Sequence, residues 1–136
     1  MLTSKPGSSI VEVDFDRPVW AYQRKLSLKT IHYSMYRIRG SRSKRVIKDK
    51  EDEEESVIAY LYCDIIGYTY HNNRKRQLLA VVNLRNVGGI STFEDSNPIF
   101  HDIIFHQVMH IECYFEDVNG NEIIFDRPTV IVLRLC

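Results

Sequence analysis

The sequence contains little cysteine. Its three cysteines, Cys63, Cys113 and Cys136, are an odd number, and no two of them have the C-x-x-C spacing. A disulfide framework and a structural zinc site are therefore not expected. Cys63 and Cys113 lie in apolar runs, so we expect them to be small core residues of a protein assembled in a reducing, intracellular environment.

Long apolar runs are also missing. Residues 1–9 contain no apolar segment of the kind found in a signal peptide. No run approaches the roughly 20 apolar residues that a membrane-spanning helix needs. The sequence therefore predicts a soluble protein that does not cross a membrane and is not secreted by the usual route.

Net charge is absent as well. The 18 basic and 18 acidic side chains cancel, so the chain as a whole is not attracted to nucleic acid or to an anionic membrane. Direct nucleic-acid binding is not expected unless a local patch supplies it. With 136 residues, of which 26% are charged and 44% hydrophobic, the chain is long enough for one globular domain with its own core.

The motifs of common catalytic and cofactor sites do not occur. There is no G-x-S-x-G nucleophile elbow and no phosphate-binding glycine loop. Asp117, Asn119 and Asn121 lack the glutamate and the spacing of a calcium loop, and a turn explains them. The basic triplet at 74–76 lacks the interleaved aromatic side chains of a single-strand-binding platform. We therefore assign no catalytic, cofactor-binding or metal-binding residue and do not expect an enzyme.

Three histidines, His101, His106 and His110, are the most plausible alternative to this conclusion. His106 and His110 would share one face of an extended strand, and three imidazoles can hold a metal with an open coordination position. No carboxylate lies at a diagnostic spacing, however, and His110 falls on the polar face of its strand. We favour surface or interface histidines, with a cupin-like metal enzyme as the alternative.

The chain does contain alternation with a period of two, which is typical of half-buried strands. Over residues 108–116, apolar side chains alternate with polar ones: Met109, Ile111, Cys113 and Phe115 with His110, Glu112, Tyr114 and Glu116. Asn119-Gly120 predicts a type I′ hairpin turn, with positive φ at both residues, that leads into a strand at 123–125. Residues 129–135 are β-branched enough for a central strand.

Further short strands are predicted along the rest of the chain. A strand at 11–15 is ended by Arg17-Pro18, others follow at 19–22, 26–33, 78–84 and 103–105, and the apolar run 57–63 predicts a strand covered on both faces. Residues 1–8 are expected to form a flexible lead, 68–77 a polar segment and 87–100 a long loop. Seven or eight short strands without an amphipathic helix predict one all-β domain over 1–136, a β-sandwich or barrel.

Residues 37–56 differ in composition from their surroundings. Their first part is basic, and their second part, from Glu51 to Glu55, is acidic. Such a charged block buries too little apolar surface to become ordered, so we expect a mobile, exposed loop, in which Val46-Ile47 could still form an edge strand. The alternative is that the basic half binds an acidic partner or nucleic acid.

Two blocks of the sequence resemble a known family. Residues 60–66 (Tyr-Leu-Tyr-Cys-Asp-Ile-Ile) and 77–82 (Gln-Leu-Leu-Ala-Val-Val) resemble a block in the small penton-like capsid proteins of Polinton/Maverick elements and adintoviruses. Residues 26–29 and Tyr33-Ser34 resemble the opening strand of that group. The C-terminal segment 111–135 is similar to its last strands, with these residues in the same order: Glu112, Asp117, Gly120, Phe125, Val130, Val132 and Leu133.

The resemblance implies a single jelly-roll β-sandwich of about eight antiparallel strands. It also implies a structural capsid protein of the virion, a penton or minor capsid subunit that is assembled inside the host cell. Such subunits form homopentamers at icosahedral vertices and contact the major capsid protein. Exposed aromatics such as Tyr22, Tyr36 and Tyr114 are candidate contact residues. The alternative is a non-enzymatic ligand- or receptor-binding β-sandwich module, such as a capsid-derived protein that serves a host cell.

Overall fold

The computed structural model describes residues 2–4, 10–39, 55–71, 74–86 and 88–136, and all regular structure in this part of the chain is β. Eight strands build the body of the molecule: β1 Leu2–Ser4, β2 Ile10–Trp20, β3 Lys25–Tyr33, β5 Glu55–Cys63, β8 Leu78–Asn86, β9 Ser91–Glu94, β11 Gln107–Glu116 and β13 Val130–Leu135. Five shorter strands lie at its ends: β4 Tyr36–Ile38, β6 Thr69–His71, β7 Arg74–Arg76, β10 His101–Asp102 and β12 Ile123–Phe125.

The eight body strands form four nested antiparallel pairs. The innermost pair is β5 with β8, and it is followed by β3 with β9, β2 with β11, and finally β1 with β13. Such a set arises when one long antiparallel ribbon is rolled up, which is the topology of a jelly roll. The predicted fold class is therefore confirmed: the chain is an all-β, single jelly roll.

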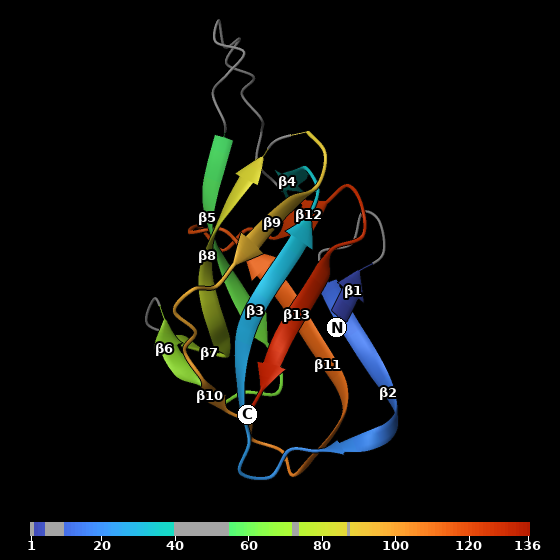
Figure 1. Cartoon of the computed structure of the whole chain (residues 1–136). Coiled ribbons are helices and arrows are strands. Elements are labelled where there is room, and N and C mark those ends of the chain that lie inside the picture. Colours follow the sequence, from blue (N-terminus) through green and yellow to red (C-terminus); the bar gives the residue numbers. More distant parts are fainter. Residues whose placement is uncertain (1, 5–9, 40–54, 72–73, 87) are drawn as a thin grey trace, which may run out of the picture.

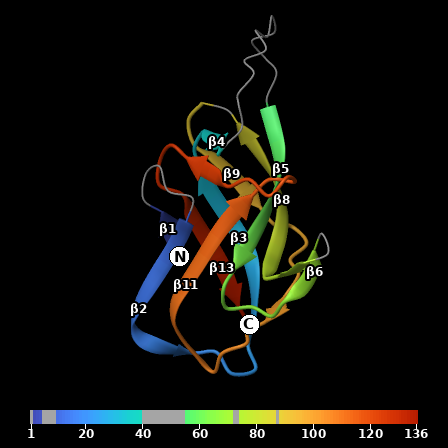
Figure 2. The ribbon, with the colours of Figure 1, turned by 180° about the vertical axis from the view of Figure 1, so that it is seen from behind.

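Rolling up places the strands in two layers (Figures 1 and 2). We call β1-β13-β3-β9 the front sheet, since it faces the viewer in Figure 1, and β2-β11-β5-β8 the back sheet. The two sheets are continuous at one side, where β1 pairs with β2. β4 pairs with β12 at one end of the sandwich, and β10 lies at the other end.

The core lies between the sheets and follows the predicted alternation. Ile111, Cys113 and Phe115 of β11 point inward and are buried, whereas Glu112 and Tyr114 on the outward face are only partly buried. Burying a large apolar side chain stabilises the fold by about 1.5–3 kcal/mol. Cys63 and Cys113 are both buried and are cross-strand partners, as expected for small core residues.

Aromatic side chains fill the end of the core that β4 and β12 close. The ring of Phe125 makes edge-to-face contacts with Phe115, Tyr33 and Tyr36, at centroid distances of 5.3, 6.0 and 5.9 Å. Aromatic pairs prefer this geometry. Tyr36, predicted to be an exposed contact residue, is buried here and donates a hydrogen bond to the carbonyl oxygen of Leu84.

The prediction of a type I′ hairpin after β11 is wrong. Among the described residues of this turn only Gly120 has a positive φ. The carboxylate of Asp117 instead accepts the N–H groups of Asn119 and Asn121, which holds an Asx-type loop. The chain leaves this loop toward β4, so β12 pairs with β4, and only the Glu116–Glu122 bridge joins the two arms of the turn.

Two predicted boundaries near the N-terminus are also wrong. β2 continues through Pro18 to Trp20, because the register with β11 shifts between Val108 and His110, and a proline in such a bulge breaks no ladder hydrogen bond. The expected flexible lead contains β1, whose Leu2 is buried in the core. Residues 5–8 of that lead lie outside the described part of the chain.

Other predictions were wrong in the middle of the chain. The long loop expected at 87–100 contains β9, and the segment 68–77 contains the short hairpin β6–β7. The strand at 57–63, predicted to be covered on both faces, is open on its outward face at Ile58, which is 51% exposed, but Tyr62 further along that face is buried. A strand expected at 103–105 is reduced to a bridge between Ile103 and Ile66, after β10. Arg37 and Ile38 of the expected charged loop belong to β4, and residues 40–54 lie outside the described part.

Candidate functional site

The three histidines singled out in the sequence do not converge. The Nε2 atom of His101 lies 2.8 Å from the carbonyl oxygen of Leu79, and the ring of His106 packs edge-on against Tyr22. His106 also precedes β11 rather than sharing its face. His110 lies on the outward face of β11, as predicted, and is engaged by carboxylates from β2. The structure therefore gives no support to a cupin-like site built from this set.

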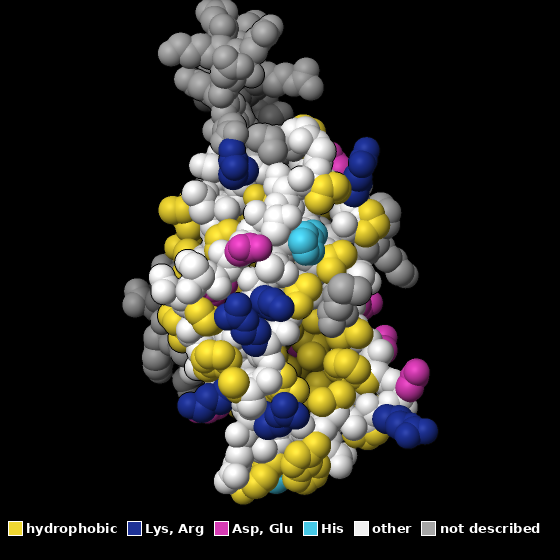
Figure 3. Space-filling model, viewed as in Figure 1, with side chains coloured by type: hydrophobic (Ala, Val, Ile, Leu, Met, Phe, Trp, Pro, Cys, Tyr) yellow, Lys and Arg dark blue, Asp and Glu magenta, His cyan; other side chains and the backbone are white. Residues whose placement is uncertain are grey.

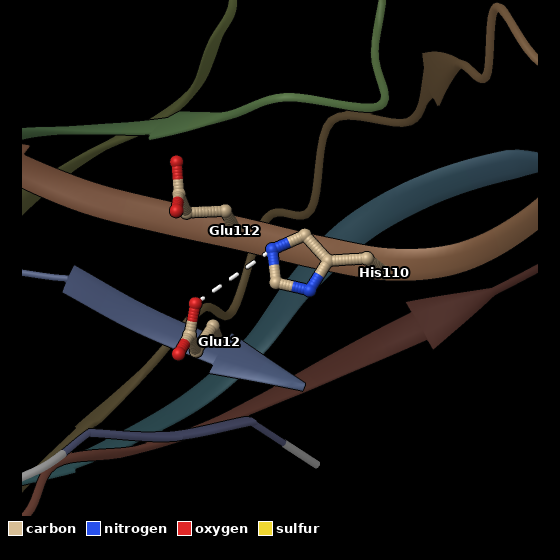
Figure 4. Close-up of side chains that lie close together, drawn as sticks. All are labelled: Glu12, His110 and Glu112. Atoms are coloured by element: carbon tan, nitrogen blue, oxygen red, sulfur yellow. Dashed lines mark ion pairs between the residues drawn. The ribbon is translucent and has the colours of Figure 1, made fainter. Parts of the chain in front are cut away.

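His110 belongs instead to a cluster that the sequence did not reveal. Its Nδ1 atom lies 2.7 Å from Oδ1 of Asp14, and its Nε2 atom lies 3.7 Å from Oε2 of Glu12. Figure 4 shows His110 and Glu112 on β11 beside Glu12 on β2. The hydrogen bond that His110 donates to the carboxylate of Asp14 raises the pKa of His110, and the neighbouring carboxylates raise it further despite some desolvation.

This cluster is the one group of three metal-ligating side chains found in the described part of the chain, with donor atoms within 4.8 Å of one another. Glu12 and Glu112 are direct cross-strand partners, an arrangement that is unfavourable for like charges. A protonated His110 relieves this repulsion without a metal. We therefore interpret the cluster as an ion-pair network that fastens β2 to β11.

A second network on the back sheet is centred on Arg76. Its guanidinium lies 4.1 Å from the ring centroid of Tyr62 and makes contacts of 3.1 Å to the hydroxyl of Tyr114 and 2.8 Å to Glu116. The rings of Tyr62 and Tyr114 stack at 5.1 Å. Burial raises the pKa of Tyr62, although the charge of Arg76 opposes the shift. Arg76, one residue of the basic triplet that was weighed as a single-strand-binding platform, is thus engaged within the fold.

The two outer faces of the sandwich carry opposite charge. On the back sheet the outward side chains of β2 and β11 are acidic: Glu12, Asp14, Asp16, Glu112 and Glu116. On the front sheet β3 and β13 present Lys25, Lys29 and Arg134, and Figure 3 shows lysine and arginine side chains gathered over these strands. These four strands therefore differ in charge between the two layers, with Glu94 of β9 on the front sheet and Arg85 of β8 on the back sheet as exceptions.

Apolar side chains form the remaining surface feature, at the end of the sandwich opposite β4 and β12. Trp20 and Tyr22 from the β2–β3 turn, and Phe100, Ile104 and Phe105 around β10, are between 38% and 57% exposed. Between the sheets near this end lies a cavity of about 180 Å³ whose lining side chains are all apolar, visible as a yellow hollow in Figure 3. Apolar surface of this extent marks sites of interaction.

Sequence reasoning missed these features because each of them depends on pairing between distant strands. The outward position of His110 could be predicted, but its partners on β2 could not. They depend on the register between β2 and β11, and Asp14 lies 96 residues before His110 in the sequence. The one available signal was the alternation of acidic side chains along 12–16, which places all of them on one strand face.

Comparison with known proteins gives no match. No protein-family model, curated protein or solved structure is significantly similar to this chain. No helix in the described part is long and apolar enough to cross a membrane.

Proposed function

We propose that this chain is a structural, non-enzymatic capsid protein: a penton or minor capsid subunit that assembles as a homopentamer at icosahedral vertices. The observation that carries the proposal is the difference in charge between β2 and β11 of the back sheet, whose outward side chains are mainly acidic, and β3 and β13 of the front sheet, whose charged outward side chains are basic. A closed ring of identical subunits needs two different, complementary surfaces on each subunit. The acidic back sheet of one copy and the basic front sheet of the next meet this requirement.

Two further features support the same function. The apolar end around Trp20 and Phe105 is exposed in the single chain and would be covered by a neighbouring subunit or by the major capsid protein. The fold and the sequence blocks at 60–66 and 77–82 are those expected of a vertex subunit of the virion.

Light scattering on the purified chain tests the proposal. A homopentamer has a mass of about 80 kDa, five times the 16.0 kDa of one chain, and electron microscopy of the same sample should show five-fold class averages. Raising the salt concentration from about 0.1 M to about 1 M shortens the Debye length from about 10 Å to about 3 Å, so the assembly should weaken. A monomer at high concentration and low salt contradicts the proposal.

A charge swap identifies the faces involved. Lys29→Glu and Asp16→Lys should each shift the equilibrium toward monomer, because each places like charges at the contact. The double variant restores opposite charges at every contact and should assemble again. Arg127→Glu, which makes the same change as Lys29→Glu in the exposed turn before β13, is the matched control and should assemble like the parent chain.

One observation favours a second candidate, a ligand- or receptor-binding β-sandwich module. The cavity between the sheets is apolar and open, as binding sites commonly are. This function predicts a monomer that is stabilised against thermal unfolding by a member of a glycan or peptide panel.

A further inference from the structure

Two cysteines that lie far apart in the sequence face each other in the back sheet. Cys63, the last residue of β5, is the cross-strand partner of Cys113 in β11. Both thiols are free and buried, and the exposed fractions of the two residues are 1% and 0%. The third cysteine, Cys136, is exposed and is hydrogen-bonded through its backbone to Lys25 on the front sheet. Cys63 and Cys113 are therefore the two cysteines that one strand pair brings together.

The hydrogen bonds around these two cysteines show which kind of strand pair they occupy. The N–H of Asp64 donates to the carbonyl oxygen of Glu112 at 3.1 Å, and the N–H of Glu112 donates back to the Asp64 carboxylate. Hydrogen-bonded and non-hydrogen-bonded pairs alternate along an antiparallel ladder, so the next pair, Cys63 with Cys113, is non-hydrogen-bonded. In agreement with this, the N–H of Cys63 donates to the carbonyl oxygen of Gln77, at 2.9 Å.

The spacing of such a pair fits a disulfide bond. In a non-hydrogen-bonded pair the two Cα atoms lie about 4.5 Å apart, and the side chains approach each other more closely than in a hydrogen-bonded pair. Cysteines joined by a disulfide have Cα atoms about 4.4–6.8 Å apart. A hydrogen bond between the two thiols, together with burial, raises the pKa of Cys113. The two sulfur atoms therefore lie next to each other, and a bond between them requires no separation of the strands.

The surroundings of the two thiols are apolar. Val11 pairs with Cys113 from the other side, on β2, and Leu61 with Phe115 is the next inward-facing pair between β5 and β11. All three of these neighbours are fully buried. The group of metal-ligating side chains found in the described part of the chain contains neither cysteine. A disulfide carries no charge, so its formation in this core has no charge-burial cost, whereas metal-bound thiolates would place charge among apolar side chains.

We propose that Cys63 and Cys113 form a reversible cross-strand disulfide bond when the protein passes from a reducing to an oxidising environment, and that this bond fastens β5 to β11. With oxidised glutathione as the oxidant, the thiolate of one cysteine attacks the glutathione disulfide, and one glutathione thiolate leaves. The other cysteine then attacks the mixed disulfide and releases the second glutathione. The two cysteines together lose two electrons and two protons, and the oxidant becomes two molecules of reduced glutathione. The proposal does not rest on the proposed capsid function.

Burial determines how fast this bond forms. The raised pKa keeps the Cys113 thiol protonated at neutral pH, and the closed core excludes the oxidant, so the reaction must wait for a local opening of the two strands. The protein is therefore expected to fold with both thiols reduced inside a cell and to become oxidised slowly outside it. The bond would close a loop of about 50 residues and stabilise the fold by restricting the unfolded chain.

Refolding in glutathione buffers tests the proposal. The parent for this experiment carries Cys136→Ser, which removes the exposed thiol that could pair between chains. After unfolding and refolding in a mainly oxidised buffer, both remaining thiols should be lost, the mass should fall by about 2 Da, and peptide mapping should join residues 63 and 113. The midpoint of thermal unfolding should lie about 10 °C above that of the sample refolded in a mainly reduced buffer. Folded protein kept in the oxidised buffer should form the same bond more slowly.

Two matched variants serve as controls. Cys63→Ala and Cys113→Ala, each combined with Cys136→Ser, leave one thiol, and their midpoints should be the same in both buffers. If an alanine variant does not fold, peptide mapping of the parent still decides whether the bond forms. Thiols that stay free in the oxidised buffer, glutathione adducts or cross-linked dimers in place of the internal bond, or a cross-linked chain whose midpoint is not raised would each overturn the proposal.

Discussion

The two ends of this jelly roll are packed in different ways. At the end closed by β4 and β12, Phe125 contacts three aromatic rings and the core is filled. Toward the end marked by β10 and the C-terminus in Figure 1, the same two sheets enclose a cavity of about 180 Å³ lined by apolar side chains. Aromatic rings thus pack against one another at the first end, which we call the filled end, whereas the second, the hollow end, retains space between its apolar side chains.

This difference separates two tasks within one small domain. An unfilled apolar cavity costs stability, on the order of 20 cal/mol for each Å³ in large-to-small core variants. The filled end must offset that cost. The hollow end, together with exposed Trp20 and Phe105 nearby, retains apolar surface that only a partner can cover. We infer that the aromatic end holds the fold together and that the hollow end is available for binding.

The comparison predicts the largest loss of stability at the filled end. Phe125→Ala removes the ring at the centre of the aromatic contacts and should lower the free energy of unfolding by about 3–5 kcal/mol. Urea denaturation measures this change as a lower midpoint with an unchanged slope. Truncation of the exposed Phe105 is the control and should change the midpoint little. Similar losses for the two variants would contradict a stabilising aromatic end.

Two substitutions that each enlarge a buried side chain should change the free energy of unfolding in opposite directions, one in the filled core and one beside the cavity. Ala59→Leu adds atoms to a fully buried position of the filled core and should destabilise the fold by about 1–3 kcal/mol through overpacking. Val108→Leu adds a methylene group beside the cavity and should stabilise the fold by about 0.5–2 kcal/mol. Thermal unfolding of both variants gives the two signs, and destabilisation by both would mean that the cavity cannot accept extra atoms.

A smaller effect is expected from one hydrogen bond at the filled end. Tyr36→Phe removes the hydroxyl that donates to the buried carbonyl oxygen of Leu84, at 2.8 Å. The loss should be about 1 kcal/mol, typical of a buried hydrogen bond. Tyr22→Phe, at an exposed position of the other end, is the matched control for urea denaturation. If Tyr36→Phe left the free energy of unfolding unchanged, packing of the ring alone would hold β4 in place.

The smallest effect is the pH dependence of the His110 cluster on β2 and β11. The pKa of His110 is raised by its hydrogen bond to Asp14, so the charged imidazole stabilises the folded state. This contribution is complete below about pH 6.5, the pKa of a histidine in the unfolded chain. It is lost as the pH rises through the raised pKa of His110 in the folded state. Asp14→Asn should flatten the pH profile of the urea midpoint above pH 6.5, whereas Asp126→Asn should not. A parent profile without this decline would contradict the role of His110.

Prediction from the sequence succeeded where a pattern depends on neighbouring residues alone. The inward and outward faces of β11 follow from the alternation around Ile111 and Glu112, and the apolar run of β13 identifies a central strand. The all-β class follows from the same local signals. Met109 departs from the alternation and is exposed, because the bulge in the ladder shifts the register just before His110.

Features set by distant pairing could not be predicted. β1 has three residues, too few for a periodic pattern, and is a strand because β13 and β2 lie on either side of it. β12 pairs with β4 rather than with β11 because Asp117 stabilises a different turn from the one that Asn119-Gly120 suggests. The cavity and the His110 cluster both depend on such registers.

The outermost of the nested strand pairs has a consequence for how the protein is made. Leu2 of β1 pairs with Ile131 of β13, so this contact can form only after that late segment has been synthesised. Contacts between such distant residues form slowly. During synthesis β1 therefore stays unpaired with β13, and the apolar Leu2 stays exposed, until β13 has been translated.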